Sequence, residues 1–226
     1  MTLSVTVLAI DSATDACSAA LWRNGALAAH AFTRRRHGHA EILLPMIRDV
    51  MEQARQAFAT LDLIATTVGP GSFTGLRIGL SSARALALAA GKPIIGLTTL
   101  EVVAAAQPAT GDPLLVAIDS RREDIFVQLF SSDLSPLCPP AAMLAADIKS
   151  ILPAGAIAIA GNAADAVRRA VPSRDLRPAG GPALPDAGIL ARCAASRFPG
   201  LSGDEPAPGP LYLRPPDAML PTRAGL

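Results

Sequence analysis

Ala9-Ile10-Asp11-Ser12 occurs a second time in this chain, as Ala117-Ile118-Asp119-Ser120. Apolar residues typical of a buried strand precede each copy, and a second strand pattern follows each copy after a short turn. Because the predicted elements around both copies recur in the same order, we infer a duplicated unit. The fold class that follows is α/β, with two similar lobes that face each other across a cleft.

The first half of the chain predicts four strands, at residues 5–11, 17–22, 26–32 and 63–68, and two helices, at residues 40–58 and 76–90. Asn24-Gly25 separates the second and third strands, and this dipeptide favours the type I′ turn of a hairpin. The first helix has apolar side chains at helical spacing, but it also contains Pro45, which a helix tolerates only in its first turn. Gly91 and Pro93 are expected to end the second helix.

The second half predicts strands at residues 115–119, 125–130 and 156–160 and helices at residues 141–152, 163–170 and 187–198. Asp186 is placed to cap the last helix. Residues 180–182 and 199–210 are predicted loops, and the tail from residue 215 is predicted to be poorly ordered. We therefore divide the chain into an N-terminal lobe, residues 1–108, and a C-terminal lobe with a Pro/Gly-rich tail, residues 109–226.

A glycine-rich loop joins the strand at residues 63–68 to the helix at residues 76–90. It consists of Gly69, Pro70, Gly71, Ser72, Phe73, Thr74 and Gly75. Two interpretations are open: a tight turn that seats the helix against the sheet, or a helix N-terminus that receives an anion or another chain's acidic group. The loop is not a phosphate-binding P-loop, because no lysine follows its last glycine, and its spacing does not match the dinucleotide-binding motif.

The composition argues against a dedicated nucleic-acid holder and against a membrane protein. The formal net charge is +1 and 17% of the residues are charged, whereas nucleic-acid-binding domains usually carry a clear positive excess. The longest stretch without charged residues, 150–164, is broken by proline and glycine and is shorter than the roughly 20 apolar residues of a membrane span. Three scattered cysteines and a start without basic residues favour a reduced, cytoplasmic protein without a signal peptide.

No set of residues resembles a self-sufficient catalytic or metal site. His37 and His39 do not share a helical face, and no credible third ligand accompanies them beyond Glu41. No serine or cysteine lies in a context typical of a catalytic nucleophile. The basic run Arg34-Arg35-Arg36 is either a solvated loop or a minor contact to nucleic-acid phosphate or to an acidic partner, and no aromatic residue is interleaved with it. We therefore predict no catalytic residues and no metal ligands.

The sequence GPGSFTGLR at residues 69–77 is identical to the signature of the TsaB family, and five other segments resemble that family. They are Ala9-Ile10-Asp11-Ser12, Arg36-His37-Gly38-His39-Ala40-Glu41, Gly96-Leu97-Thr98-Thr99-Leu100-Glu101, Ile118-Asp119-Ser120-Arg121-Arg122 and Pro210-Leu211-Tyr212-Leu213-Arg214. Ser120 departs from the family pattern, which has alanine there. The resemblance runs from about residue 5 to residue 214 and is densest before residue 130.

This resemblance implies a fold and a role. TsaB (YeaZ) proteins are similar to the catalytic subunit TsaD and share its duplicated fold of the actin, sugar-kinase and Hsp70 class (ASKHA). The implied role is a non-catalytic subunit that scaffolds and activates TsaD, which transfers threonylcarbamoyl to the adenosine beside the anticodon of tRNA; the ATPase TsaE joins them. The chain is then no enzyme by itself and holds no cofactor, ATP and metal belong to partner subunits, and tRNA is contacted indirectly.

Site residues follow from the same resemblance. Asp11, Ser12 and Asp119 lie where the actin-like class holds nucleotide phosphates and magnesium, and in TsaB proteins this site is expected to be vestigial or complete only in the complex. The apolar surface of the helices at residues 40–58 and 76–90 can also be explained by ordinary core packing, but the resemblance implies that these helices bind TsaD, or a second copy of the chain when TsaD is absent. The expected interface residues are Ile42, Leu43, Met46, Ile47, Arg77, Leu80 and Arg84.

Two other functions are alternatives. A stand-alone metallopeptidase or glycopeptidase would need bound metal. A small ATP-dependent kinase of the same fold would need ATP between the lobes, and such kinases are usually much longer than 226 residues.

Overall fold

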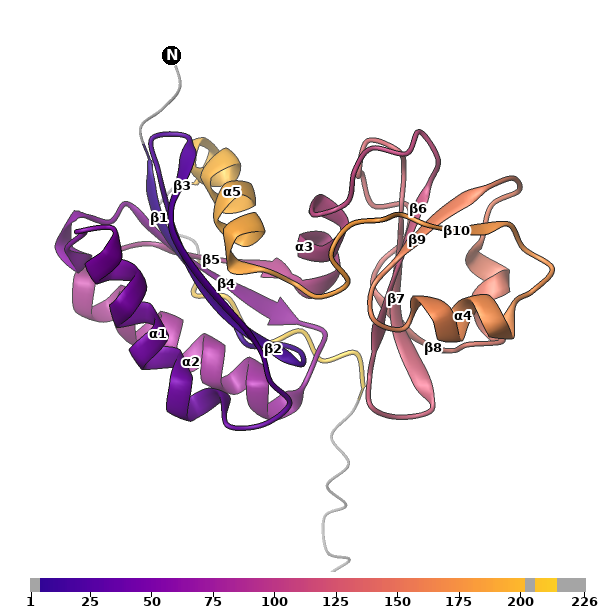
Figure 1. The fold of residues 1–226 in the computed structure, drawn as a ribbon, viewed down its shortest axis with the longest axis horizontal. Helices are drawn as coiled ribbons and strands as arrows, with labels where there is room; N and C mark the ends of the chain where they lie inside the picture. Colours follow the sequence, from indigo (N-terminus) through magenta and orange to yellow (C-terminus); the bar gives the residue numbers. More distant parts are fainter. Residues whose placement is uncertain (1–4, 202–205, 215–226) are drawn as a thin grey trace, which may run out of the picture.

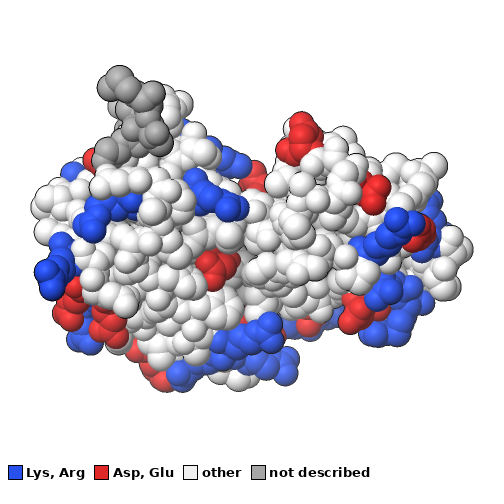
Figure 2. All heavy atoms as spheres, turned by 45° about the horizontal axis from the view of Figure 1, so that its top comes forward, with Lys and Arg blue, Asp and Glu red and all other residues white. Residues whose placement is uncertain are grey.

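The computed structural model describes residues 5–201 and 206–214, which form two α/β lobes, each built on a five-stranded sheet. Figure 1 shows the lobes side by side, with the first part of the chain in one and the middle of the chain in the other. Figure 2 shows a hollow between the lobes and, on the face it displays, charges of both signs among mostly uncharged residues.

The first sheet combines a hairpin with two parallel strands. Its strands are β1 (Thr6–Asp11), β2 (Ala16–Arg23), β3 (Ala26–Arg34), β4 (Leu63–Gly69) and β5 (Ile94–Thr98), in the spatial order β3-β2-β1-β4-β5. β2 pairs antiparallel with β1 and β3, whereas β4 pairs parallel with β1 and β5. Asn24 and Gly25 have positive φ angles of 54° and 79°, the geometry of the predicted type I′ turn.

Three helices cover the two faces of this sheet (Figure 1). They are α1 (His39–Gln53) and α2 (Phe73–Ala90) on one face and α5 (Ala187–Arg197) on the other. Leu43 and Ile47 of α1 are in the same buried cluster as Leu8 of β1, and full burial of each such side chain contributes about 1.5–3 kcal/mol. No helix within residues 5–201 and 206–214 is long and apolar enough to cross a membrane.

The second sheet has the same arrangement. Its strands are β6 (Leu114–Asp119), β7 (Asp124–Phe130), β8 (Ala141–Leu144), β9 (Ile157–Ala160) and β10 (Leu176–Pro178). α3 (Thr99–Ala105) packs against β6, and α4 (Ala164–Ala170) lies on the second sheet as well. Read from β8, the strand order is β8-β7-β6-β9-β10, which repeats the order of the first sheet. Asp11 ends β1 and Asp119 ends β6, so the two motif copies occupy equivalent places and the predicted duplication is confirmed.

The predicted helix at residues 141–152 is wrong. Strand β8 pairs antiparallel with β7, with Met143 opposite Ile125 and Ala142 opposite Phe126, and Asp147–Ile151 form a short 3-10 helix. The segment is rich in alanine and leucine, which favour helix. The edge of β7 nevertheless offers it backbone partners, and this tertiary pairing outweighs local propensity.

The first helix is shorter than predicted. α1 ends at Gln53 rather than at residue 58, because Arg55 adopts a left-handed backbone with φ 51° and Phe58–Thr60 form a separate 3-10 turn. Pro45 lies in the second turn of α1 and not in the first. It is exposed, so water can satisfy the carbonyl group that a proline leaves without an N–H partner.

Three short elements were not predicted: β5, α3 and β10. β5 has five residues and β10 has three, and neither segment was assigned an element from its sequence pattern. The start of α3 can be recognised in the sequence, because Thr98 is followed three residues later by Glu101. In the structure the Thr98 hydroxyl accepts from the Glu101 N–H at 3.0 Å, and the Glu101 carboxylate accepts from the Thr98 N–H at 2.8 Å. This reciprocal pair is a capping box.

The predicted division into lobes 1–108 and 109–226 needs a correction. After β10 the chain returns to the first lobe, where Leu190 of α5 joins the cluster that contains Val7. This face of the first sheet is apolar, and α5 covers it together with Val102 of α3. Asp186 caps α5 as predicted, since its carboxylate accepts from the Gly188 N–H at 2.7 Å. The predicted tail from residue 215 lies outside the described residues.

The start of α2 lies against the turn that follows β1. The N–H of Ser72 donates to the carbonyl of Ala13 at 2.7 Å, and the hydroxyl of Ser12 donates to the carbonyl of Gly75 at 2.8 Å. A Cβ atom on Gly71 would lie 2.2 Å from the Ala13 oxygen, and one on Gly75 would lie 2.1 Å from the Ser12 oxygen. Of the two interpretations of the glycine loop, the tight turn that seats the helix therefore accounts for these glycines. The capped helix also starts earlier than predicted, at Phe73.

We expect Gly75→Ala to lower the free energy of unfolding, because its methyl group meets a backbone oxygen that cannot rotate away. Overpacking costs about 1–3 kcal/mol, and the better helix propensity of alanine offsets up to about 1 kcal/mol of that. Urea denaturation measures the change. Gly200→Ala is the control, because a Cβ there meets nothing within 4 Å. A Gly75→Ala protein as stable as the wild type would contradict the packing argument.

Candidate functional site

The two lobes meet where the turn after β1 faces the turn after β6, a region that we call the lobe junction (residues 12–15 and 119–121 with Ser72 and Asn162). Arg121 makes an ion pair with Asp15, and Arg36 lies 3.7 Å from the same carboxylate. The N–H of Asp119 donates to the side-chain oxygen of Asn162 at 2.8 Å. The segments that follow the two motif copies are thus joined by ionic and polar contacts.

Asp11, predicted as a nucleotide-site residue, is fully buried. Its Oδ1 accepts from the hydroxyl of Thr67 at 2.6 Å and from the N–H of Ala13 at 3.3 Å. Its Oδ2 is buried and has no hydrogen-bond partner among the residues that the structure describes. Burial raises the pKa of Asp11 from 3.8 to about 7, although the bonds from Thr67 and Ala13 oppose the rise. The Asp11 carboxyl group is therefore a buried hydrogen-bond acceptor in the interior of the first lobe.

Ser12 and Asp119 complete the predicted nucleotide site but lie in different surroundings. Ser12 is buried beneath α2, with its hydroxyl bound to Gly75. Asp119 is exposed, and its carboxylate accepts the N–H of Arg121 at 2.8 Å. The cavity between the two turns is about 10 Å³, roughly the minimum for one water molecule. The space between the two turns is therefore small in this structure.

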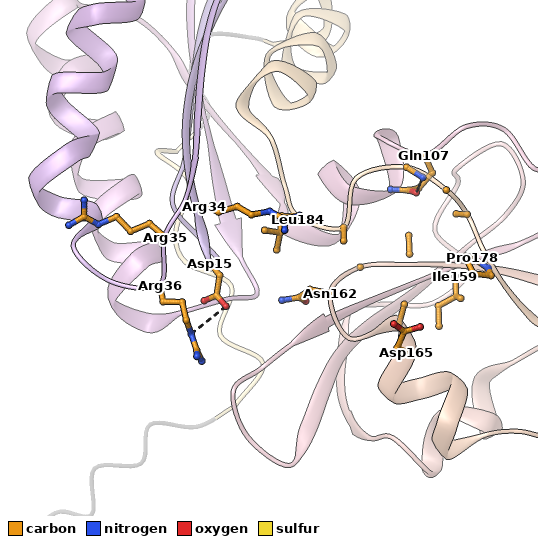
Figure 3. A pocket seen from close by; sticks show the side chains of 17 residues that line it. Asp15, Arg34, Arg35, Arg36, Gln107, Ile159, Asn162, Asp165, Pro178 and Leu184 are labelled. Atoms are coloured by element: carbon orange, nitrogen blue, oxygen red, sulfur yellow. Dashed lines mark hydrogen bonds and ion pairs between the residues drawn. The ribbon is translucent and has the colours of Figure 1, made fainter.

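A larger cleft of about 720 Å³ lies beside the junction and contains the basic run Arg34–Arg36 in its wall. The opposite wall is formed by residues of β9, α4 and β10 and by the loops beside them. Figure 3 shows Arg36 paired with Asp15 and Arg34 extending toward Leu184. The side chains of Arg34–Arg36 therefore line the cleft between the lobes, and the run is not only a solvated loop.

A second opening, which we call the arginine–aromatic groove, lies between the start of α2, the turn after β6 and residues 211–214. Its volume is about 630 Å³. Four arginines and three aromatic residues line it: Arg77, Arg121, Arg122, Arg214, Phe73, Phe126 and Tyr212. The small junction cavity shares Ser72, Ser120 and Arg121 with this groove and shares Asp15 and Asn162 with the cleft. The junction thus separates two larger spaces.

The predicted interface residues fall into two groups. Four are buried in the first lobe, with exposed fractions of 9% or less: Leu43, Met46, Ile47 and Leu80. They hold α1 and α2 on the sheet and are not available to a partner, which corrects the prediction for them. Arg77 and Arg84 are exposed, and Ile42 is half-buried. An apolar stripe at helical spacing does not by itself reveal whether it faces the protein's own sheet or another chain.

The two neighbouring histidines lie in different environments, with His39 buried at the start of α1 and His37 exposed. His30 contacts Asp186 at 2.9 Å, which links β3 to the start of α5. Across the described ranges, 5–201 and 206–214, no three His, Cys, Asp or Glu side chains lie close enough to hold a metal ion together.

The groove residues Phe126, Tyr212 and Arg214 were not predicted as site residues. The contact that brings them together joins segments far apart in the chain: Nε of Arg214 donates to Asp124 at 2.5 Å. The only local signal was the presence of arginines beside aromatic residues in 118–126 and 210–214, two segments that lie far apart in the sequence.

Asp11→Asn tests the buried carboxyl group. An acid whose pKa is raised in the folded state stabilises it below the unfolded pKa, and that stability is lost as the pH rises to the folded pKa. Between about pH 4 and pH 7, Asp11 should therefore lower the free energy of unfolding by about 1.4 kcal/mol per pH unit. Asp11→Asn should lack this dependence, so its stability relative to the wild type should rise over that range.

Urea denaturation at several pH values measures this difference. Asp49→Asn, on the exposed side of α1, is the matched control for loss of a carboxylate. A wild-type and Asp11→Asn difference that stays constant with pH would show that Asp11 is ionised in the folded protein.

Comparisons with known proteins agree with this architecture. The family model described as TsaD, tRNA N6-adenosine threonylcarbamoyltransferase, matches residues 33–173. The tRNA threonylcarbamoyladenosine biosynthesis protein TsaB of Escherichia coli (strain K12) is 39% identical over 129 residues, 56% of this chain and 55% of that protein. This chain thus spans about half the length of that relative. An uncharacterized protein of Mycobacterium tuberculosis is 35% identical over 217 residues, 94% of this chain and 93% of that protein.

Solved structures show the same fold. YeaZ from Pseudomonas aeruginosa has a TM-score of 0.78 and 26% identity, and the match covers 92% of this chain and 100% of that one. An activator of 2-hydroxyisocaproyl-CoA dehydratase from Clostridium difficile, at 9% identity and a TM-score of 0.50, shares the fold alone. The lobes are the duplicated actin-like (ASKHA) fold. From the family model and these relatives, the chain belongs to the TsaB (YeaZ) family, which is related to TsaD.

Proposed function

We propose that this chain is a non-catalytic subunit of the machinery that makes threonylcarbamoyladenosine in tRNA. It scaffolds and activates a TsaD-type transferase, and a TsaE-type ATPase joins them. The proposal is supported by the name of the E. coli relative, a tRNA threonylcarbamoyladenosine biosynthesis protein. ATP and metal belong to the partner subunits in this proposal, and the chain works in the cytoplasm.

The observation that carries the non-catalytic role is the filled lobe junction. In the actin-like class, nucleotide phosphates lie against the turn after the first strand. Here the start of α2 covers that turn through the Ser72–Ala13 and Ser12–Gly75 hydrogen bonds, and about 10 Å³ remains between the turns. This packing supports a role in binding other subunits rather than in chemistry on a nucleotide at this place.

The outward faces of α1 and α2 are the surface that we propose for the partner. Leu44 on α1 is 55% exposed, and Leu88 on α2 is 85% exposed. Such large apolar side chains have no packing role within the lobe, and arginines, which are enriched at protein interfaces, share the face of α2 at Arg77 and Arg84. The revised interface therefore keeps both helices with Arg77 and Arg84, and it replaces the buried residues of the prediction with the exposed Leu44 and Leu88.

The first experiment is a reconstitution with purified proteins. The chain is omitted from, or added to, a mixture of TsaD and TsaE from the same organism, ATP, substrate tRNA and threonylcarbamoyl-adenylate. We expect mass spectrometry of the tRNA nucleosides to find threonylcarbamoyladenosine only when the chain is present. Equal modification without the chain would refute the proposed function.

Leu88→Glu tests the partner surface. It should weaken co-purification with TsaD by tenfold or more, because truncating or charging an interface centre costs upward of about 1.4 kcal/mol. Leu144→Glu, on the exposed side of β8 in the second lobe, is the matched control at 50% exposure. If both variants bind TsaD equally well while circular dichroism shows both to be folded, this surface is not the interface.

A further inference from the structure

The arginine–aromatic groove gathers an unusual share of the aromatic residues of the chain. The sequence contains six phenylalanines, one tyrosine and one tryptophan, and three of these eight rings line this one groove. Tyr212 and Phe73 are 43% and 53% exposed, although large rings are normally buried for stability. Their ring centroids are 5.4 Å apart at 31°. No packing need of the first lobe explains two adjacent exposed rings.

Planar guanidinium groups extend this stacking surface. The guanidinium carbon of Arg77 lies 3.7 Å from the centroid of the Phe73 ring, and its Nε donates to the Tyr212 hydroxyl at 3.2 Å. On the opposite wall, Arg214 lies over the Phe126 ring at 5.1 Å. Both guanidinium groups therefore lie within cation–π distance of an aromatic ring in the groove, and guanidinium groups can also bind planar or anionic ligands.

The lining of the groove is positive. None of the residues that line it is acidic. Asp15 and Asp124, just outside the lining, make ion pairs with Arg121 and Arg214. Arg77 is paired with an aromatic ring and a hydroxyl rather than with a carboxylate. Arg77 therefore brings a positive charge into the groove that no carboxylate of the described residues neutralises, on a chain whose net charge is only +1.

We propose that the arginine–aromatic groove binds a nucleotide unit, with the base stacked on Tyr212 and the phosphate held by arginines. Exposed aromatic rings and arginine planes beside a basic groove are the features that bind single-stranded nucleic acid, where stacking contributes about 1–3 kcal/mol per base. The volume of about 630 Å³ also lies within the range of roughly 300–1,000 Å³ typical of small-molecule sites.

An acidic protein segment fits the groove less well. Carboxylates would use the arginines, but they would make no stacking contact with the exposed parts of the Phe73 and Tyr212 rings. A nucleotide uses both kinds of group. Of the two sources of a nucleotide unit, we favour single-stranded RNA over a free nucleotide, and this preference rests on the proposed function in tRNA modification.

The test titrates the purified full chain into a fluorescently labelled single-stranded oligoribonucleotide of about ten nucleotides, within the site sizes known for such grooves. Fluorescence anisotropy is recorded at several salt concentrations. We expect Tyr212→Leu to weaken binding about fivefold or more, since one stacked base is lost. Tyr212→Phe, which keeps the ring, should bind like the wild type.

Arg122→Ala tests the phosphate contact through a different readout. It should reduce the slope of log K against log salt by about 0.7, the value for one phosphate contact on a single strand. Tyr212→Leu should leave that slope unchanged. Arg177→Ala is the control for removal of an arginine, because Arg177 lies on β10, pairs with Asp175 and does not line the groove.

Competition with unlabelled ATP and with polyglutamate separates the ligands. If RNA binds with these effects and ATP does not compete, the proposal holds with RNA as the source. If ATP competes and binds with the same Tyr212 dependence, the nucleotide site holds and the preference for RNA is wrong. Absence of binding, or polyglutamate competition with no effect of Tyr212→Leu, overturns the proposal. The binding assay contains no partner protein and measures no catalytic turnover. A negative result in it would therefore refute the groove proposal without affecting the proposed function, which the tRNA-modification reconstitution tests separately.

Discussion

Backbone lies against backbone at the start of α2, where the carbonyl oxygens of Ser12 and Ala13 meet Gly75 and Gly71. The contact fixes the position of an eighteen-residue helix relative to the central strand of its sheet. It also consumes hydrogen-bonding groups of the turn after β1, because Ser12 donates into α2 and Ala13 accepts from Ser72. Without glycine at both positions, the helix would have to move outward.

The same contact shapes the space between the lobes. Because α2 covers the turn, the region between the two motif copies is nearly filled, and the openings lie to either side of it. Phe73 and Arg77 project from the first turns of α2 into one of these openings. The contact between α2 and the turn after β1 therefore fills the lobe junction and also places Phe73 and Arg77 in the arginine–aromatic groove.

Charged and apolar side chains are distributed unevenly over the surface of the protein. The chain is close to neutral as a whole, yet seven of its arginines line the two openings, where Asp15 pairs with Arg36 and Arg121. A low net charge thus does not describe the surfaces between the lobes. The outward faces of α1 and α2 differ again, since Leu44 and Leu88 add apolar surface there.

The residues alone determined the duplicated α/β fold, because the repeated motif and the periodicity around it are local properties of the chain. They also predicted the Asn24-Gly25 hairpin and the Asp186 cap, whose geometry depends on a few neighbouring residues. Helix propensity failed at residues 141–152, where pairing with β7 decided the structure. Sequence periodicity showed that α1 has an apolar stripe, but only packing showed that Leu43 and Ile47 face the sheet.

The sites depended most on tertiary structure. Asp11 is the last residue of a predicted strand, and only the burial that the tertiary structure creates raises its pKa to about 7. The arginine–aromatic groove joins Phe73, Arg122 and Tyr212, which are separated along the chain and meet because residues 206–214 return across both lobes. Local patterns specify elements, whereas burial and long-range contact decide what those elements present to a ligand.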